Sequence, residues 1–189
     1  MSRAKMLILR GNSARAGTYP DEKGDKIAWP LGALHVQAAK DYANRRGYDA
    51  IVLDAPGQPQ SGHSPQTKAA LKKFLEDPTT CAFYGFSGGG YNLWHILHQL
   101  ASLHTESLHR IDLVVVLGSP KTHKTAYQAS GFNSIARKKV HPAQWKDAQW
   151  EVVYGTNPPP NWPLPPGVPS NAMRHMFCPE WLLAGMPAK

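Results

Sequence analysis

The sequence is poor in cysteine and contains no long apolar run. Cys81 and Cys178 are the only cysteines among 189 residues, far fewer than a disulfide-stapled domain needs, so we expect two free thiols and a reducing compartment. No stretch of about 18 uncharged apolar residues occurs, and the apolar run at residues 6–9 is too short for the core of a signal peptide. We therefore expect a cytoplasmic chain without a membrane span.

Acidic residues are also scarce. The chain has 13 of them against 21 lysines and arginines, which gives a formal net charge of +8. An excess of positive charge favours anionic partners. The basic residues are scattered in short clusters without a basic tail, however, so the pattern does not favour nucleic-acid binding.

Aliphatic runs alternate with segments of helical periodicity along the chain. Runs rich in β-branched residues predict strands, and apolar residues three or four apart predict helices. The expected strands cover residues 6–9, 49–53, 81–86, 111–117 and 150–154, and the expected helices cover residues 34–46, 67–76, 91–103 and 180–184. This alternation is typical of an α/β fold with a mostly parallel central sheet and helices on both faces, a three-layer sandwich. We expect one domain over residues 1–189.

Three further segments have little or no predicted regular structure. Residues 11–30 are predicted to form polar loops because glycine, proline and small polar residues recur there. Residues 119–149 are basic and polar, and only a weak periodicity near Ile135 indicates a helix there. Residues 158–169 are rich in proline and are expected to form an extended surface loop.

A serine flanked by glycines follows the third predicted strand. Gly85, Ser87 and Gly89 form a Gly-x-Ser-x-Gly pattern, which is specific for acyl-transfer enzymes only when a strand precedes it and a helix follows. Both are predicted here. A serine on such a sharp turn projects its hydroxyl above the sheet, and the N–H of the next residue, Gly88, faces the developing oxyanion. The pattern predicts Ser87 as a nucleophile.

Two other interpretations of residues 85–90 remain open. The glycines can serve a tight strand-to-helix turn, or they can hold a phosphate at a helix N-terminus. No Lys-Ser/Thr pair follows them, as a P-loop requires, and their order does not match the dinucleotide pattern G-x-G-x-x-G. We therefore expect no nucleotide cofactor.

Four stretches, taken together, follow the order found in one known family. They are residues 7–12 (LILRGN), 49–57 (DAIVLDAPG), 85–89 (GFSGG) and 171–179 (NAMRHMFCP). They resemble the α/β-hydrolase superfamily, in particular its small lipase- or esterase-like members without a cap domain, over most of the chain. The resemblance implies that the N–H of Asn12 or Ser13 completes the oxyanion hole and that His175 is the general base. Arg10 departs from the pattern, because the family often has histidine there.

The acid of the expected catalytic triad is the second departure. Family order implies an acid just after the penultimate strand, where this chain has Asn157. An asparagine carbonyl can accept the imidazole N–H and fix its tautomer, but it offers no negative charge, and replacing a triad aspartate by asparagine costs about 10⁴ in rate. Asp147 and Glu180 are the alternative acids.

His95 and His98 lie three residues apart on a predicted helix, a spacing at which a metal pair is conceivable. No third ligand accompanies them in a motif. We therefore expect surface or partly buried histidines and no metal.

These features predict a serine hydrolase that cleaves an ester or related acyl bond through a Ser87 acyl-enzyme, with His175 as base and no cofactor. The chain leaves no room for a large cap domain, so we expect an open site walled by residues 119–149 and 158–169. Such a site suits a small-molecule or polymeric acyl substrate, and the net charge favours an anionic one.

Two other function classes remain open. Asn157 and Arg10, which both depart from the family pattern, favour a non-catalytic binding protein on a hydrolase scaffold. The glycine run and the positive charge favour a phosphate- or nucleotide-binding α/β protein.

Overall fold

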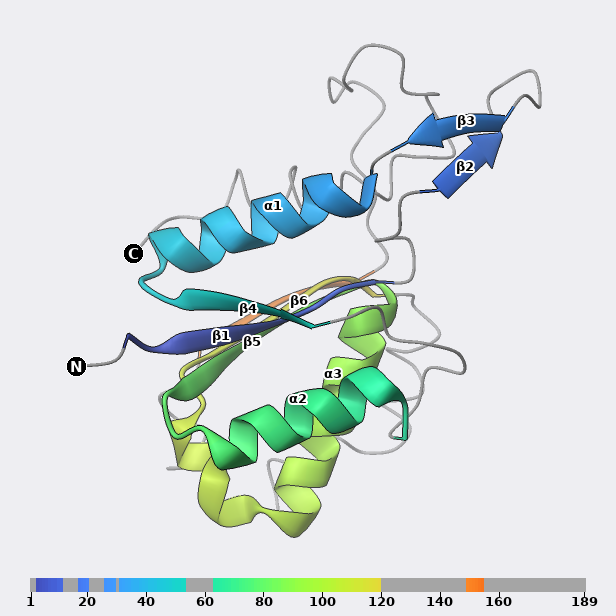
Figure 1. Ribbon diagram of the computed structural model, residues 1–189. Helices are drawn as coiled ribbons and strands as arrows, with labels where there is room; N and C mark the ends of the chain where they lie inside the picture. Colours follow the sequence, from blue (N-terminus) through green and yellow to red (C-terminus); the bar gives the residue numbers. More distant parts are fainter. Residues whose placement is uncertain are drawn as a thin grey trace.

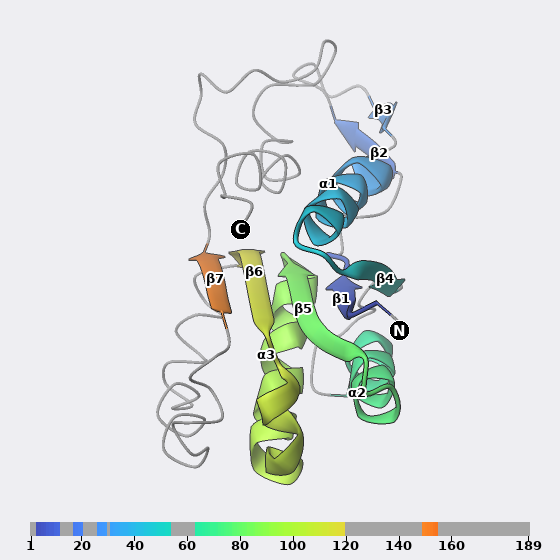
Figure 2. The same ribbon diagram turned by 90° about the vertical axis from the view of Figure 1, so that its left-hand side faces the viewer.

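The computed structural model of the protein describes residues 3–11, 17–20, 26–29, 31–53, 63–119 and 149–154. Within these residues the main sheet has five strands, all parallel, in the order β4-β1-β5-β6-β7 (Figure 1 and Figure 2). The strands are β1 (Lys5–Leu9), β4 (Asp49–Leu53), β5 (Thr80–Phe86), β6 (Leu113–Ser119) and β7 (Gln149–Tyr154). Each overlaps a predicted strand, and the parallel sheet confirms the predicted α/β class.

Helices cover both faces of this sheet. Helix α1 lies on one face, and α2 and α3 lie on the other (Figure 1). The helices are α1 (Leu31–Arg45), α2 (Pro65–Glu76), α3 (Gly88–Leu103) and the short 3-10 helix η2 (Thr105–Arg110). No helix in the described part of the chain is both long and apolar enough to cross a membrane.

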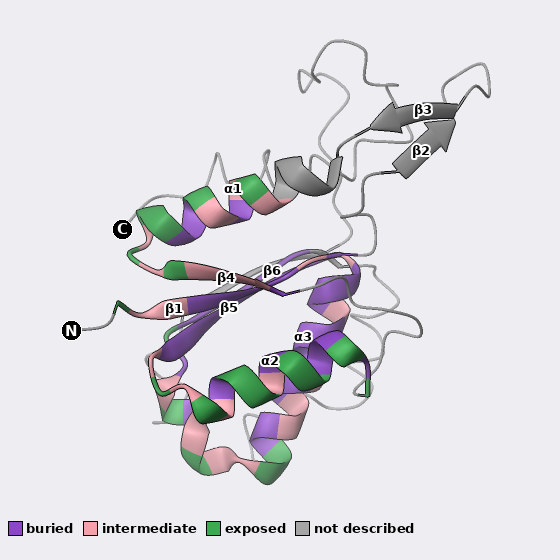
Figure 3. Ribbon diagram, in the orientation of Figure 1, coloured by how far each residue is buried: buried purple, intermediate pink, exposed green. Residues whose placement is uncertain are grey.

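The alternation of side chains along each strand explains this layering. Successive residues of a strand point to opposite faces, so Leu7 packs in the core beneath α2 and α3, whereas Met6 packs in the core beneath α1. Every residue of β5 is buried, as a strand covered on both faces requires. Figure 3 shows the buried residues gathered in the sheet and on the sides of α2 and α3 that face it.

The prediction of polar loops between residues 11 and 30 is wrong in two places. Gly17–Pro20 forms β2 and Lys26–Trp29 forms β3, an antiparallel pair separate from the main sheet. Both strands contain residues that favour extended backbone, including Tyr19 and Trp29. The nearby prolines and glycines obscured that preference in the sequence.

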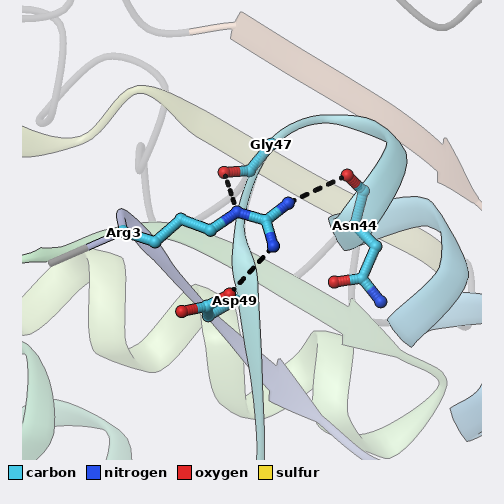
Figure 4. A network of polar contacts seen from close by, with 4 residues as sticks. All are labelled: Arg3, Asn44, Gly47 and Asp49. Carbon is cyan, nitrogen blue, oxygen red and sulfur yellow. Dashed lines mark hydrogen bonds and ion pairs between the residues drawn. The ribbon is translucent and has the colours of Figure 1, made fainter.

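A polar network ties α1 to the amino-terminal edge of the sheet (Figure 4). The Arg3 side chain donates hydrogen bonds to the carbonyl oxygens of Gly47 and Asn44, at 3.1 and 3.3 Å, and to the Asp49 carboxylate at 3.1 Å. Half of each charged side chain is exposed, and an exposed ion pair contributes only about 0–1 kcal/mol. The network therefore fixes the path of the chain from α1 into β4 more than it adds stability.

Several predicted segments lie outside the described residues. They include the proline-rich segment at residues 158–169 and the predicted helix at residues 180–184. The basic segment at residues 119–149 also lies outside, except for its ends, which belong to β6 and β7.

Candidate active site

Ser87 lies at the carboxyl end of β5, the middle strand of the sheet, directly before α3. The carboxyl ends of the parallel strands meet at one edge of the sheet, the upper edge in Figure 2. The neighbouring strand β1 leads to α1 on one face, whereas β5 leads to α3 on the other. In open α/β sheets, ligands bind in the crevice created where the connections diverge in this way. Ser87 occupies that position.

The backbone of Ser87 is strained. Its φ is 53° and its ψ is −118°, and it is the only non-glycine residue with positive φ in the described part of the chain. Such a conformation costs about 1–3 kcal/mol and persists only where the surroundings hold it. The Ser87 N–H donates to the Leu117 carbonyl of β6 at 3.0 Å, and the Tyr91 N–H donates to the Ser87 carbonyl at 3.2 Å. The next strand and the first turn of α3 therefore hold the residue in place.

The Ser87 hydroxyl is not used to cap the helix. A serine at a helix start normally has extended backbone and accepts a hydrogen bond from an N–H of the first turn. Ser64 does this for α2, with φ −61°, ψ 151° and a bond of 3.2 Å from the Thr67 N–H. Ser87 occupies the corresponding position of α3 but makes no capping bond with its side chain. The turn at Ser87 therefore differs from an ordinary helix start both in its backbone and in its side-chain bonding.

The two glycines flanking Ser87 are required by close backbone contacts. A Cβ atom on Gly89 would lie 2.1 Å from the Leu9 carbonyl oxygen and 2.6 Å from that of Arg10. A Cβ atom on Gly85 would lie 2.8 Å from the Gly90 Cα atom. The Gly-x-Ser-x-Gly pattern thus lets α3 begin directly against its own strand and against the end of β1.

The end of β1 also reaches Ser87 itself. A Cβ atom on Gly11 would lie 3.0 Å from the Ser87 Cβ atom and 2.8 Å from the Phe86 carbonyl oxygen. The chain therefore leaves β1 beside the serine, where the second oxyanion donor was expected. Asn12 and Ser13, the predicted donors, lie outside the described residues.

Gly88, the other predicted oxyanion donor, is the first residue of α3 and is buried. The N–H groups in the first turn of a helix have no partner within that helix, and the helix dipole places partial positive charge there. An anion that forms at Ser87 would therefore meet a favourable field at this end of α3.

Two buried amides beside this turn are not among the predicted site residues. The Gln66 side chain, at the start of α2, donates from Nε2 to the Arg10 carbonyl oxygen at 2.9 Å. The Asn92 side chain, on α3, donates from Nδ2 to the Gln66 Oε1 atom at 3.0 Å. Gln66 is 2% exposed and Asn92 is fully buried. Gln66 lies one helical turn before the buried Ala70. The sequence signal that could have identified Gln66 was therefore a polar residue on the apolar face of α2.

Cys81 lies far from Ser87, near the amino end of β5. It is a free cysteine and is buried. Burial raises the pKa of its thiol to about 12, with a further contribution from a hydrogen bond with Asp112. A thiol reacts as the thiolate, so the raised pKa predicts little reactivity of Cys81 at neutral pH.

The two histidines of α3 and the predicted base and acid fall into two groups. His95 and His98 are half-buried on α3, and the His95 ring packs edge-on against Tyr91 with centroids 4.8 Å apart. In the part of the chain that the structure describes, no group of three His, Cys, Asp or Glu residues could hold a metal. The predicted base, the predicted acid and its two alternatives lie outside the described residues: His175, Asn157, Asp147 and Glu180.

Comparison of the chain with protein-family models, with curated proteins and with solved structures finds no match. The position of Ser87 in this fold, the geometry around it and the sequence pattern are therefore the basis for a functional proposal.

Proposed function

We propose that the protein is a serine hydrolase that cleaves an ester or related acyl bond through an acyl-enzyme on Ser87. The observation that carries the proposal is the conformation of Ser87. A φ of 53° places a non-glycine residue in a costly region of backbone space, and its hydroxyl is not used as a helix cap. Strain of this kind gathers at functional sites, where the geometry it produces is part of the mechanism.

The proposed reaction begins when His175 accepts the Ser87 hydroxyl proton and the serine oxygen attacks the acyl carbon. The negative charge that develops on the acyl oxygen is stabilised by the N–H of Gly88 and by that of Asn12 or Ser13. The alcohol then leaves with the proton from His175, and water, activated by the same imidazole, releases the acid and restores Ser87.

Asn157 would orient the imidazole of His175 by accepting its other N–H. It supplies no negative charge to the imidazolium formed in the transition state, so an enzyme with Asn157 in this place would be slow. A substrate with a reactive leaving group depends less on such assistance. The net charge of +8 favours acyl substrates that carry negative charge.

A phosphate-binding protein is the second candidate, favoured by the start of α3 at the carboxyl edge of the parallel sheet. One contact weighs against it. The carbonyl oxygens of Leu9 and Arg10 lie over Gly89, the second residue of α3. A phosphate approaching this side of the helix would therefore meet hydrogen-bond acceptors as well as the donors it needs.

Hydrolysis of p-nitrophenyl butyrate tests the proposed function. Ser87→Ala and His175→Ala should reduce hydrolysis to the background rate, whereas Ser102→Ala, an exposed serine on the same helix, should match the wild type. Asn157→Asp should raise kcat, by up to about 10⁴ if Asn157 holds the position of the acid. Hydrolysis that survives in Ser87→Ala would overturn the proposal.

The second candidate has its own test. Inorganic phosphate should not raise the melting temperature of the wild-type protein if the proposal is correct. A wild type that hydrolyses no ester but binds phosphate, with the binding weakened by Gly88→Ala, would favour the phosphate-binding function instead.

A further inference from the structure

The Arg10 carbonyl is held on two sides near Ser87. Its oxygen accepts a hydrogen bond from Gln66 Nε2 at 2.9 Å, and it lies where a Cβ atom on Gly89 would come within 2.6 Å. The peptide that this carbonyl belongs to joins Arg10 to Gly11. Gly11 in turn lies against Ser87. The Arg10–Gly11 peptide therefore joins the carbonyl bonded by Gln66 to the residue that lies against Ser87.

The orientation of both buried amides follows from this carbonyl. A backbone carbonyl can only accept a hydrogen bond, so Gln66 must present its NH₂ group to Arg10. Its oxygen, Oε1, then faces Asn92, which must donate in turn, as the 3.0 Å bond from Nδ2 records. The chain from Arg10 through Gln66 to Asn92 has one arrangement in which every contact pairs a donor with an acceptor.

We infer that Gln66, oriented by Asn92, is a positioning residue for the Arg10–Gly11 peptide, which lies against Ser87. A trans peptide is planar, so fixing the direction of the Arg10 carbonyl also fixes the N–H and Cα atoms of Gly11, the residue beside Ser87. Without Gln66 the carbonyl loses its partner on that side, and the peptide gains freedom to rotate. This inference rests on the proposed hydrolase function and names a residue on which its rate depends.

Three substitutions break the arrangement in different ways. Gln66→Met keeps the length of the side chain but removes the donor. Gln66→Glu places carboxylate oxygens against the Arg10 carbonyl oxygen. Asn92→Asp removes the donor that orients Gln66. Phe74→Leu is the matched control, because Phe74 is buried on α2 and packs against Phe83, away from the turn at Ser87.

The test is a comparison of kcat, KM and melting temperature with p-nitrophenyl butyrate as substrate. A displacement of about 1 Å in a catalytic group costs about 10²-fold, so the three variants should lose about 10- to 100-fold in kcat with KM changed less than about twofold. Phe74→Leu should lower the melting temperature and keep kcat. If the Gln66 and Asn92 variants keep wild-type kcat, or lose no more than Phe74→Leu at equal stability, the inference fails.

Hydrogen–deuterium exchange separates this inference from the proposed function. The segment from Leu9 to Gly11 should exchange faster in the Gln66 variants than in the wild type and Phe74→Leu. A wild type that hydrolyses no ester removes the hydrolase proposal and the positioning role with it. Faster exchange in that case shows that Gln66 holds the segment for another purpose, whereas unchanged exchange overturns the structural argument as well. If Gln66→Glu does not fold, Gln66→Met and Asn92→Asp provide the same comparison.

Discussion

Replacing Gly89 by alanine tests the contact between α3 and the end of β1. Alanine is normally the better residue in a helix, by about 1 kcal/mol. Here its Cβ atom would lie 2.1 Å from the Leu9 carbonyl oxygen, whereas Cβ atoms essentially never approach other atoms within 3.0 Å. One side must therefore move by about 0.9 Å, the difference between these distances. The neighbours are backbone atoms of β1, which cannot rotate away as a side chain would.

We expect Gly89→Ala to destabilise the fold, because overpacking a tight contact costs about 1–3 kcal/mol. For a chain of this size each kcal/mol lowers the melting temperature by about 2–4 °C. Urea unfolding and thermal melting measure the change. The substitution should also reduce ester hydrolysis, since it pushes Arg10 and Gly11 away from Ser87.

Gly47→Ala is the control for this substitution. Gly47 has a φ of 87°, and a Cβ atom on it would have no other atom within 4 Å. Alanine there should therefore cost about 1 kcal/mol through backbone strain alone and leave hydrolysis unchanged. If Gly89→Ala is as stable as the wild type, or more stable, the close approach of β1 to α3 is refuted.

The remaining predictions concern single groups. Ser87→Gly should be more stable than Ser87→Ala by about 1 kcal/mol in urea unfolding, because glycine relieves the strained backbone; equal stability would contradict the strain. Hydrogen bonds from Lys5 and Thr79 hold the pKa of Asp77 well below its usual range. The ionised Asp77 carboxylate therefore stabilises the fold fully above the unfolded-state pKa of about 3.9, and this stabilisation is lost as the pH falls toward the lower pKa of the folded state. Asp77→Asn should therefore show a smaller loss of stability in acid than the wild type, and an identical acid profile would count against the pair. With a thiol pKa of about 12, Cys81 should not react with Ellman's reagent at pH 8 unless the protein is unfolded. Rapid labelling of Cys81 in the folded protein would contradict this expectation and show that the thiol is accessible.

The sequence predicted the strands well where burial alone determines them. The aliphatic residues of β6 from Leu113 to Leu117 are all fully buried, which is why an unbroken apolar run was a reliable signal. The predicted start of that strand at Ile111 is two residues early. The Ile111 N–H donates to the Leu108 carbonyl and ends η2. The buried side chain of Ile111 therefore packs in the core from a turn and not from a strand.

The starts of α2 and α3 were predicted too late, for two different reasons. Helix α3 begins at Gly88, and its first residues are glycines although glycine is a poor helix former. The contact of Gly89 with the end of β1 excludes a larger residue at that position. Helix α2 begins at Pro65 with Ser64 as its cap. That start had a local signal, a serine followed by proline at the first helical position, which favours helix initiation.

The candidate site was predictable only in its local part. The turn at Ser87 depends on residues that are neighbours in sequence. The structure has the expected strand, sharp turn and helix at this place. Gln66 and the Arg10 carbonyl lie 56 residues apart in sequence, and no local pattern predicts a hydrogen bond over that separation. His175 and Asn157 were assigned from family order, and their roles remain predictions.

Covalent labelling with a fluorophosphonate probe tests the central claim most directly. The probe phosphonylates a serine only when that serine is activated as a nucleophile. Tandem mass spectrometry of the labelled wild type should locate one adduct on Ser87, absent from Ser87→Ala and His175→Ala and retained in Ser102→Ala. A folded wild type that stays unlabelled, or an adduct on any other residue, would contradict the assignment of Ser87 as the nucleophile.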